Sequence, residues 1–450
     1  MRVWFGLLVL ILTARIGSLA AQVKPEWIAR YNGPALRSSA QAVTVDPKGN
    51  VYVTGWSVGA DSDMDYATVK YDPYGNERWV ARYNGPGNST DSALGVAVDG
   101  AGNVYVTGWS MGVGTNSDYA TIKYDADGNQ RWVARYNGPD NCSDAGLALA
   151  LDATGYVYVA GWSIGKATDT DYVTIKYDPE GNELWTSRYN GPGNFEDNAS
   201  ALALDAEGNV YVTGWSTGIG TDTDYATVKY DAGGDLVWVA RYNGPANRAE
   251  YSTSLAVDAA GNVYVTGWSM GLRWDTDYAT VKYDADGEER WVARYDGPLN
   301  GDDDGVALAL AGDYLYVIGR SVGAGTGLDY VTVQYDQDGI ERWVARYNGP
   351  GNREDWPIAL AVDAEGYVYV AGTSTGLETR RDYATVKYDA GGKEVWSVRY
   401  DGPVQADDTL AALALTAAGH VYVTGSTCLG LDKRGFCAGT AYATIKYLQE

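Results

Sequence analysis

Residues 93–136 read ALGVAVDGAGNVYVTGWSMGVGTNSDYATIKYDADGNQRWVARY, and this stretch decides the fold. Runs rich in Val, Tyr, Thr and Trp alternate with turns rich in Gly, Asp and Asn, which is typical of short β-strands joined by tight hairpins. We predict strands at Ala93–Asp99, Asn103–Ser110, Asp118–Asp125 and Gln130–Tyr136. Apolar residues lie on both faces of these strands, so each sheet is expected to be covered on both sides.

The same pattern fills almost the whole chain. The Trp that opens W-x-x-R-Y recurs at intervals of 52 or 53 residues, at Trp27, Trp79, Trp132, Trp185, Trp238, Trp291, Trp343 and Trp396. The Tyr that opens Y-A-T-V-K-Y recurs eight times as well, at Tyr66, Tyr119, Tyr172, Tyr225, Tyr278, Tyr330, Tyr383 and Tyr442. Repeats of this length with four short antiparallel strands each predict a β-propeller.

The two ends of the repeat region are complementary. The region begins with a fourth strand, Glu26–Tyr31, and ends with a third strand, Tyr442–Tyr447. Pairing them would complete the last blade and leave no open sheet edge. We therefore predict an all-β fold, a closed eight-bladed β-propeller with four antiparallel strands per blade and the N-terminal strand completing the last blade. It forms one domain over residues 22–450, and we expect a monomer.

Residues 1–21 have the features of a secretory signal. A basic start at Met1–Arg2 precedes an apolar run, Val3–Thr13, and the small residues Ser18-Leu19-Ala20 offer a cleavage site. The alternative is an uncleaved anchor, which Arg15 disfavours. No other apolar run approaches the ~20 residues that a membrane helix needs. We expect the mature chain to be exported, to the periplasm, the cell surface or the medium, without inserting into a membrane.

Export determines how the cysteines are interpreted. Cys428 and Cys437 lie nine residues apart in a loop that is longer in the eighth repeat than in the others. In an oxidising compartment such a pair predicts a disulfide. Cys142 is left as a free thiol.

The charged and metal-binding residue types exclude several functions. The net charge is −24, and it becomes −26 without residues 1–21, which contain two arginines and no acid. An acidic surface argues against nucleic acid as a partner. One His, His420, and three Cys cannot build a His-ligated or Cys-rich metal centre. The Asp-x-Asp-Gly turns, as at Asp125–Gly128, lack the further ligands of a calcium loop, so we predict hairpin turns, no metal and no cofactor.

The repeat resembles a known family. The A-x-A-V-D-x-x-G-N-V-Y-V-T-G core, as in Leu94–Gly108, is followed by D-Y-x-T-x-K-Y and G-N-x-x-W. This order is similar to that of the beta-propeller repeat found mostly in exported bacterial proteins and first described for seven-bladed members. The resemblance covers residues 26–447, here with eight copies, and implies an exported propeller without supplying catalytic residues. Asp125–Trp132 also resembles the tryptophan-docking segment of eight-bladed quinoprotein dehydrogenases, whose adjacent cysteine pair this chain lacks.

Two sets of equivalent positions are candidates for ligand binding. The first is a carboxylate ring that precedes seven of the eight predicted first strands, with Ser38 in the remaining repeat: Asp91, Asp144, Asp197, Glu250, Asp303, Asp355 and Asp408. If the first strand is innermost, the ring surrounds one mouth of the channel and could attract a cation or a basic partner. Alternatively, each member caps its own loop by accepting backbone N–H bonds.

The second set is a tryptophan arc, formed by the Gly-Trp-Ser that ends five consecutive second strands: Trp56, Trp109, Trp162, Trp215 and Trp268. The next three repeats have Arg320, Thr373 and Ser426 there, so strict packing does not dictate this position. Aromatic faces beside carboxylates suit a neutral or basic polymer. The alternative is that these tryptophans fill gaps between blades.

Near-identical repeats without a unique polar cluster favour binding over catalysis, because catalysis needs an acid and a base in different environments. We therefore expect an exported non-catalytic scaffold that binds a polysaccharide or a protein through the face with the long loops. Two alternatives remain: a glycan lyase or hydrolase with its site at the channel mouth, and a structural protein of the cell envelope.

Overall fold

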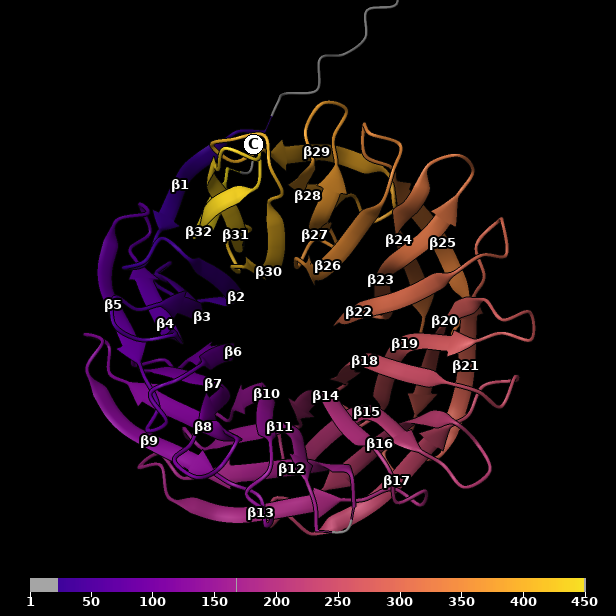
Figure 1. The fold of residues 1–450 in the computed structure, drawn as a ribbon. Helices are drawn as coiled ribbons and strands as arrows, with labels where there is room; N and C mark the ends of the chain where they lie inside the picture. The colour runs from indigo at the N-terminus through magenta and orange to yellow at the C-terminus, as the bar shows by residue number, and fades with distance from the viewer. Residues whose placement is uncertain (1–22, 167, 449–450) are drawn as a thin grey trace, which may run out of the picture.

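The computed structural model describes residues 23–166 and 168–448, and these form eight four-stranded antiparallel sheets arranged as a ring (Figure 1). The predicted signal segment lies outside the described residues. The first strand of every sheet is innermost (Figure 1), and successive strands lie further out. The prediction of an all-β propeller with eight blades is confirmed.

The strand bounds repeat from blade to blade. The innermost strands are β2 Ser38–Val45, β6 Asp91–Val98, β10 Asp144–Leu151, β14 Asp197–Leu204, β18 Glu250–Val257, β22 Asp303–Ala311, β26 Asp355–Val362 and β30 Thr409–Leu415. The second strands are β3 Val51–Val58, β7 Val104–Met111, β11 Val157–Ile164, β15 Val210–Thr217, β19 Val263–Met270, β23 Tyr314–Gly323, β27 Val368–Thr375 and β31 Val421–Leu431. The third strands are β4 Met64–Tyr71, β8 Ser117–Tyr124, β12 Thr170–Tyr177, β16 Thr223–Tyr230, β20 Thr276–Tyr283, β24 Gly327–Asp336, β28 Arg381–Tyr388 and β32 Cys437–Tyr447. The outer strands are β5 Glu77–Tyr83, β9 Gln130–Tyr136, β13 Glu183–Tyr189, β17 Leu236–Tyr242, β21 Glu289–Tyr295, β25 Glu341–Tyr347, β29 Glu394–Tyr400 and β1 Pro25–Tyr31.

The ring closes in blade 8, where β1 is the outer strand (Figure 1). It pairs antiparallel with β32, so that Ala29 lies opposite Thr444 and Tyr31 opposite Tyr442. Lys446 forms an ion pair with Glu26 at 2.7 Å across the same seam. The predicted closure by the N-terminal strand is therefore confirmed.

Each blade contributes to two hydrophobic clusters, one on either side. In β15, Val210 and Val212 pack in a cluster shared with blade 3, whereas Tyr211 packs in a cluster shared with blade 5. This alternation follows from the period of two along a strand, and it explains why both faces of the strands are apolar. Buried tyrosines also cross the interfaces: the Tyr172 hydroxyl donates to the carbonyl oxygen of Ala226 at 3.1 Å.

Asp-Gly turns join the strands on one face of the ring. The Asp125 carboxylate accepts N–H bonds from Asp127 at 3.0 Å and from Asn129 at 2.9 Å. Gly128 adopts φ = +86°, and a Cβ there would lie 2.7 Å from the Trp79 ring of the previous blade. Only glycine meets both requirements. The oxygens of Asp125 therefore hold a hairpin turn, as predicted.

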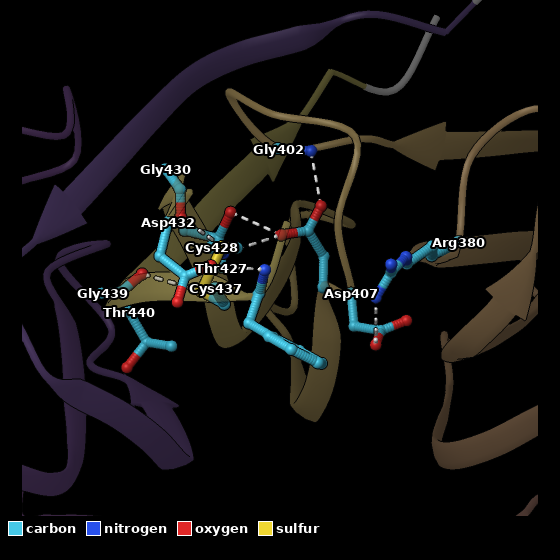
Figure 2. The surroundings of a disulfide bond; sticks show 12 residues. Arg380, Gly402, Asp407, Thr427, Cys428, Gly430, Asp432, Cys437, Gly439 and Thr440 are labelled. Carbon is cyan, nitrogen blue, oxygen red and sulfur yellow. Dashed lines mark hydrogen bonds and ion pairs between the residues drawn. A yellow bond between two sulfur atoms is a disulfide. The ribbon is translucent and has the colours of Figure 1, made fainter. Parts of the chain in front are cut away.

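The opposite face carries the longer connections, which we call the long-loop face. Its main irregularity is in blade 8, where β31 and β32 extend into a hairpin held by a disulfide between Cys428 and Cys437 (Figure 2). The predicted disulfide is confirmed, and Cys142 is a free, half-buried thiol. Across the part of the chain that the structure describes, no helix has the length and apolar character needed to cross a membrane.

Candidate functional site at the channel mouth

The carboxylate ring lies where the innermost strands begin on the long-loop face. Asp91 is the first residue of β6 and lies opposite Ser110 of β7. The prediction started this strand at Ala93 because it placed the acid in the loop; the pairing with Ser110 extends the strand by two residues.

The ring members are buried rather than open to the channel. All seven carboxylates and the equivalent Ser38 have no exposed surface. The Gly85 N–H donates to one oxygen of Asp91 at 2.7 Å, and the Met111 N–H donates to the other at 3.0 Å. Asp197 accepts the corresponding bonds from Gly191 and Thr217. In this arrangement the acids fix the two loops of the long-loop face, and other side chains form the surface beside them.

Burial has a marked effect on the ring carboxyls. It raises the pKa of Asp303 to about 6 and that of Glu250, the only glutamate in the ring, to about 8. The desolvation cost of the charged form is the main cause, and neighbouring aspartates add to it. Glu250 therefore holds its proton at neutral pH.

The tryptophan arc lies one residue before the serine that pairs with the ring. All five indoles, of Trp56, Trp109, Trp162, Trp215 and Trp268, are partly buried and keep some surface open to solvent.

An aromatic contact links the arc between blades 4 and 5. The Trp215 ring of blade 4 lies 5.0 Å from the ring of Tyr251 in blade 5, and Tyr251 stacks on Trp268 at 4.5 Å. These are favourable aromatic distances, so this end of the arc forms a continuous aromatic surface.

Blades 6 and 7 continue the arc with different chemistry. Arg320 occupies the tryptophan position, pairs with Asp304 at 2.6 Å and lies 5.8 Å from the ring of Trp356. The Arg381 guanidinium lies 4.3 Å from the same ring. In blade 7 the equivalent position holds Thr373, whose hydroxyl accepts the N–H of Leu410 at 3.1 Å.

The loop tips of the long-loop face expose apolar side chains. In four blades the loop between the second and third strands exposes an aliphatic side chain directly after a glycine. These side chains are 75–79 % exposed, at Val113, Ile219, Leu272 and Leu377. Trp274 is 69 % exposed, and its ring is covered on one side by the Arg248 guanidinium at 3.1 Å from the ring centre.

The arginines of the outer strands do not form an open cationic ring. Seven of them pair with the aspartate at the start of the third strand in their own blade, as Arg135 does with Asp118 at 2.6 Å. Blade 8 is different, because Ala441 replaces that aspartate and Arg30 bonds to the Tyr400 hydroxyl at 2.8 Å instead.

Sequence reasoning missed Tyr251, which lies between two tryptophans of the arc. Tyr251 and Trp356 are the second residues of their innermost strands, and each lies opposite the arc position of its own blade. The antiparallel register of the first hairpin could have identified Tyr251. The stacking of Arg248 on Trp274 joins two loops and has no signal in the sequence.

Comparison with known proteins agrees with this architecture. Residues 26–61, 78–113 and 237–271 match the model of the SBBP beta-propeller repeat. The "Regulatory protein FlaEY" of Caulobacter vibrioides is 34 % identical over 125 residues, which cover 24 % of this chain and 13 % of that protein. The "Uncharacterized WD repeat-containing protein L264" of Acanthamoeba polyphaga mimivirus is 21 % identical over 386 residues, covering 74 % of this chain and 24 % of that protein. The chain thus spans about a quarter or less of the length of these curated relatives.

Among solved structures, puromycin hydrolase is similar at a TM-score of 0.48 and 15 % sequence identity. The match covers 89 % of this chain and 60 % of that chain. The family model matches three segments of the chain, and the structure arranges the repeat region as eight blades.

Proposed function

We propose that the protein is an exported, non-catalytic binding scaffold whose ligand is a neutral or basic polymer, a polysaccharide or a protein segment, held on the long-loop face. One observation carries the proposal: five indoles at equivalent positions near the ends of the second strands keep part of their surface open to solvent. Indole faces stack on sugar rings and peptide groups, and indole N–H groups donate hydrogen bonds.

Two further features support a ligand on this face. Val113, Ile219, Leu272 and Leu377 expose aliphatic side chains on the same face as the arc, in blades 2, 4, 5 and 7. Exposed apolar groups that gather on one face mark interaction surfaces. The overall charge of the chain is strongly negative, which disfavours polyanions and favours neutral or basic ligands.

The test uses the mature chain on an array of neutral glycans, acidic glycans and basic peptides. We expect binding to neutral glycans or basic peptides, and we expect the double variant Trp162→Ala, Trp215→Ala to lose it with little change in melting temperature. The matched control is Tyr74→Ala with Tyr314→Ala, which removes two exposed aromatic side chains from the opposite face. Equal binding by the arc variant would contradict the proposal, and an arc variant that unfolds would assign these tryptophans to the core.

The alternatives are tested on the same sample. A screen of glycan lyase and hydrolase substrates examines the enzymatic alternative. If neither the array nor the screen gives a signal, the structural envelope alternative is favoured.

A further inference from the structure

Three carboxylates converge on the long-loop face where blade 7 meets blade 8. Asp382 is in β28, Asp401 directly follows β29, and Asp408 directly precedes β30. One oxygen of each lies within 4.8 Å of the others. Asp382 and Asp408 are almost completely buried, with 2 % and 0 % of their surface exposed, whereas Asp401 is open to solvent. The group is therefore buried on one side and reachable from the other.

The third carboxylate is a departure from the repeat. Six of the eight copies carry asparagine at the Asp401 position, at Asn32, Asn84, Asn137, Asn190, Asn243 and Asn348. In blade 1 this asparagine is neutral and donates to the Asn88 side chain at 2.7 Å. Asp401 instead adds a negative charge beside the carboxylates of Asp382 and Asp408.

Among the residues that the structure describes, Arg399 is the cation that pairs with this group. The Arg399 guanidinium and the Thr379 hydroxyl both bind Oδ2 of Asp382 at 2.7 Å. Oδ1 of Asp382 is buried and has no hydrogen-bond partner within the described residues. An equivalent unpartnered oxygen recurs in other blades, but there an uncharged asparagine stands beside it.

Hydrogen bonds from the surrounding loops fix the position of the Asp408 carboxylate. It accepts bonds from the Gly402 N–H at 2.5 Å, the Thr427 hydroxyl at 2.6 Å and the Cys428 N–H at 3.1 Å. Figure 2 shows the Thr427 and Cys428 donors beside the disulfide. Burial and the neighbouring Asp382 raise the pKa of Asp401, which is the effect of crowding like charges. The arrangement leaves an excess of negative charge and an unfilled oxygen at one point.

We propose that Asp382, Asp401 and Asp408 bind a calcium ion between blades 7 and 8. Calcium accepts six to eight oxygen ligands in flexible geometry, so three carboxylates supply part of its shell and water supplies the rest, whereas magnesium demands a stricter octahedron. A site with few protein ligands, partly neutralised by Arg399, belongs with the weak extracellular calcium sites, whose dissociation constants are roughly 10⁻⁴–10⁻³ M. The ion would join the two blades beside the disulfide loop. The inference does not depend on the proposed function.

The chain contains a second acidic group, Asp275, Asp277 and Asp296, which includes the other asparagine-to-aspartate departure. The experiment removes it first, so that a single site is counted. The starting protein is the mature chain with Asp296→Asn, stripped with EDTA and dialysed. Isothermal titration with CaCl₂ gives the stoichiometry, and thermal unfolding with and without CaCl₂ gives the shift in melting temperature.

We expect one calcium ion per chain and a higher melting temperature with calcium. Adding Asp401→Asn should abolish both effects while the calcium-free protein melts as before, because asparagine is the residue that six blades already carry. The matched control is Asp407→Asn, which removes the same charge from the adjacent, exposed residue and should leave calcium binding intact. No saturable uptake up to about 5 mM CaCl₂, above the weak range, would overturn the proposal. Uptake that survives Asp401→Asn would overturn it too.

Discussion

Closure of the ring by β1 can be tested directly, because removing residues 23–34 deletes β1 and opens the ring at blade 8. The Trp27 ring packs against aromatic rings of β4 and β31 at 6.3 and 6.0 Å, and the Tyr31 ring packs against one of β32 at 5.3 Å. Ala29 is buried beside them. Complete burial of a large apolar side chain contributes about 1.5–3 kcal/mol. Because Trp27 and Tyr31 are only partly buried, we expect a loss on the order of 3 kcal/mol, several degrees in melting temperature.

The assay is thermal unfolding followed by circular dichroism, with size-exclusion chromatography to detect association through the exposed edge of β32. The matched control moves residues 25–31 behind Tyr447, joined by a copy of the Asp389–Lys393 turn, so that blade 8 becomes continuous in sequence. This permuted chain should recover the stability of the parent. A truncated chain that stays monomeric and melts with the parent would refute the argument that β1 closes the ring.

Two further predictions concern buried charge. Arg135→Ala leaves the buried carboxylate of Asp118 without its cation and should lower the free energy of unfolding by roughly 3 kcal/mol. Arg30→Ala should lower the free energy of unfolding by less than about 1 kcal/mol, because blade 8 has Ala441 where the other blades have the paired aspartate. Equal losses of unfolding free energy for the two variants in urea denaturation would contradict this. Burial raises the pKa of Glu250 from 4.5 to about 8, so the folded state keeps a proton that the unfolded state releases, and the free energy of unfolding falls as pH rises between those values. Glu250→Gln should remove about 2–3 kcal/mol of that fall, after allowing for screening by nearby water; parent and variant curves that stay parallel would refute it.

Much of the fold could be predicted from the sequence, because strand period, turn residues and repeat spacing are all local signals. The strands of the second repeat were predicted within two residues of β6, β7, β8 and β9. The closure was predictable because a spare fourth strand and a missing one stand at opposite ends of the repeat region. The disulfide followed from a loop insertion that carries both of its cysteines.

The site was less predictable, because its properties depend on contacts between blades. Whether Asp91 points into the channel or back at its own loop is decided by the N–H groups of Gly85 and Met111, which meet only after the hairpin has formed. The contact between the rings of Trp215 and Tyr251 joins neighbouring repeats at a sequence separation that no local pattern encodes. The grouping of Asp382 with Asp401 and Asp408 likewise depends on how blades 7 and 8 pack in the folded chain.

The seam in blade 8 has a consequence for how such a gene can change. The closing strand β1 carries the same W-x-x-R-Y pattern as every other outer strand, and β32 carries the same Y-A-T-x-K-Y pattern as the other third strands. Loss or duplication of one whole 53-residue unit inside the gene would leave both partners of the seam intact. The ends would still match, and each interface would still join similar surfaces. Recombination can therefore change the number of repeats in one step. The curvature between neighbouring blades, rather than the closing contact, then sets which ring sizes fold.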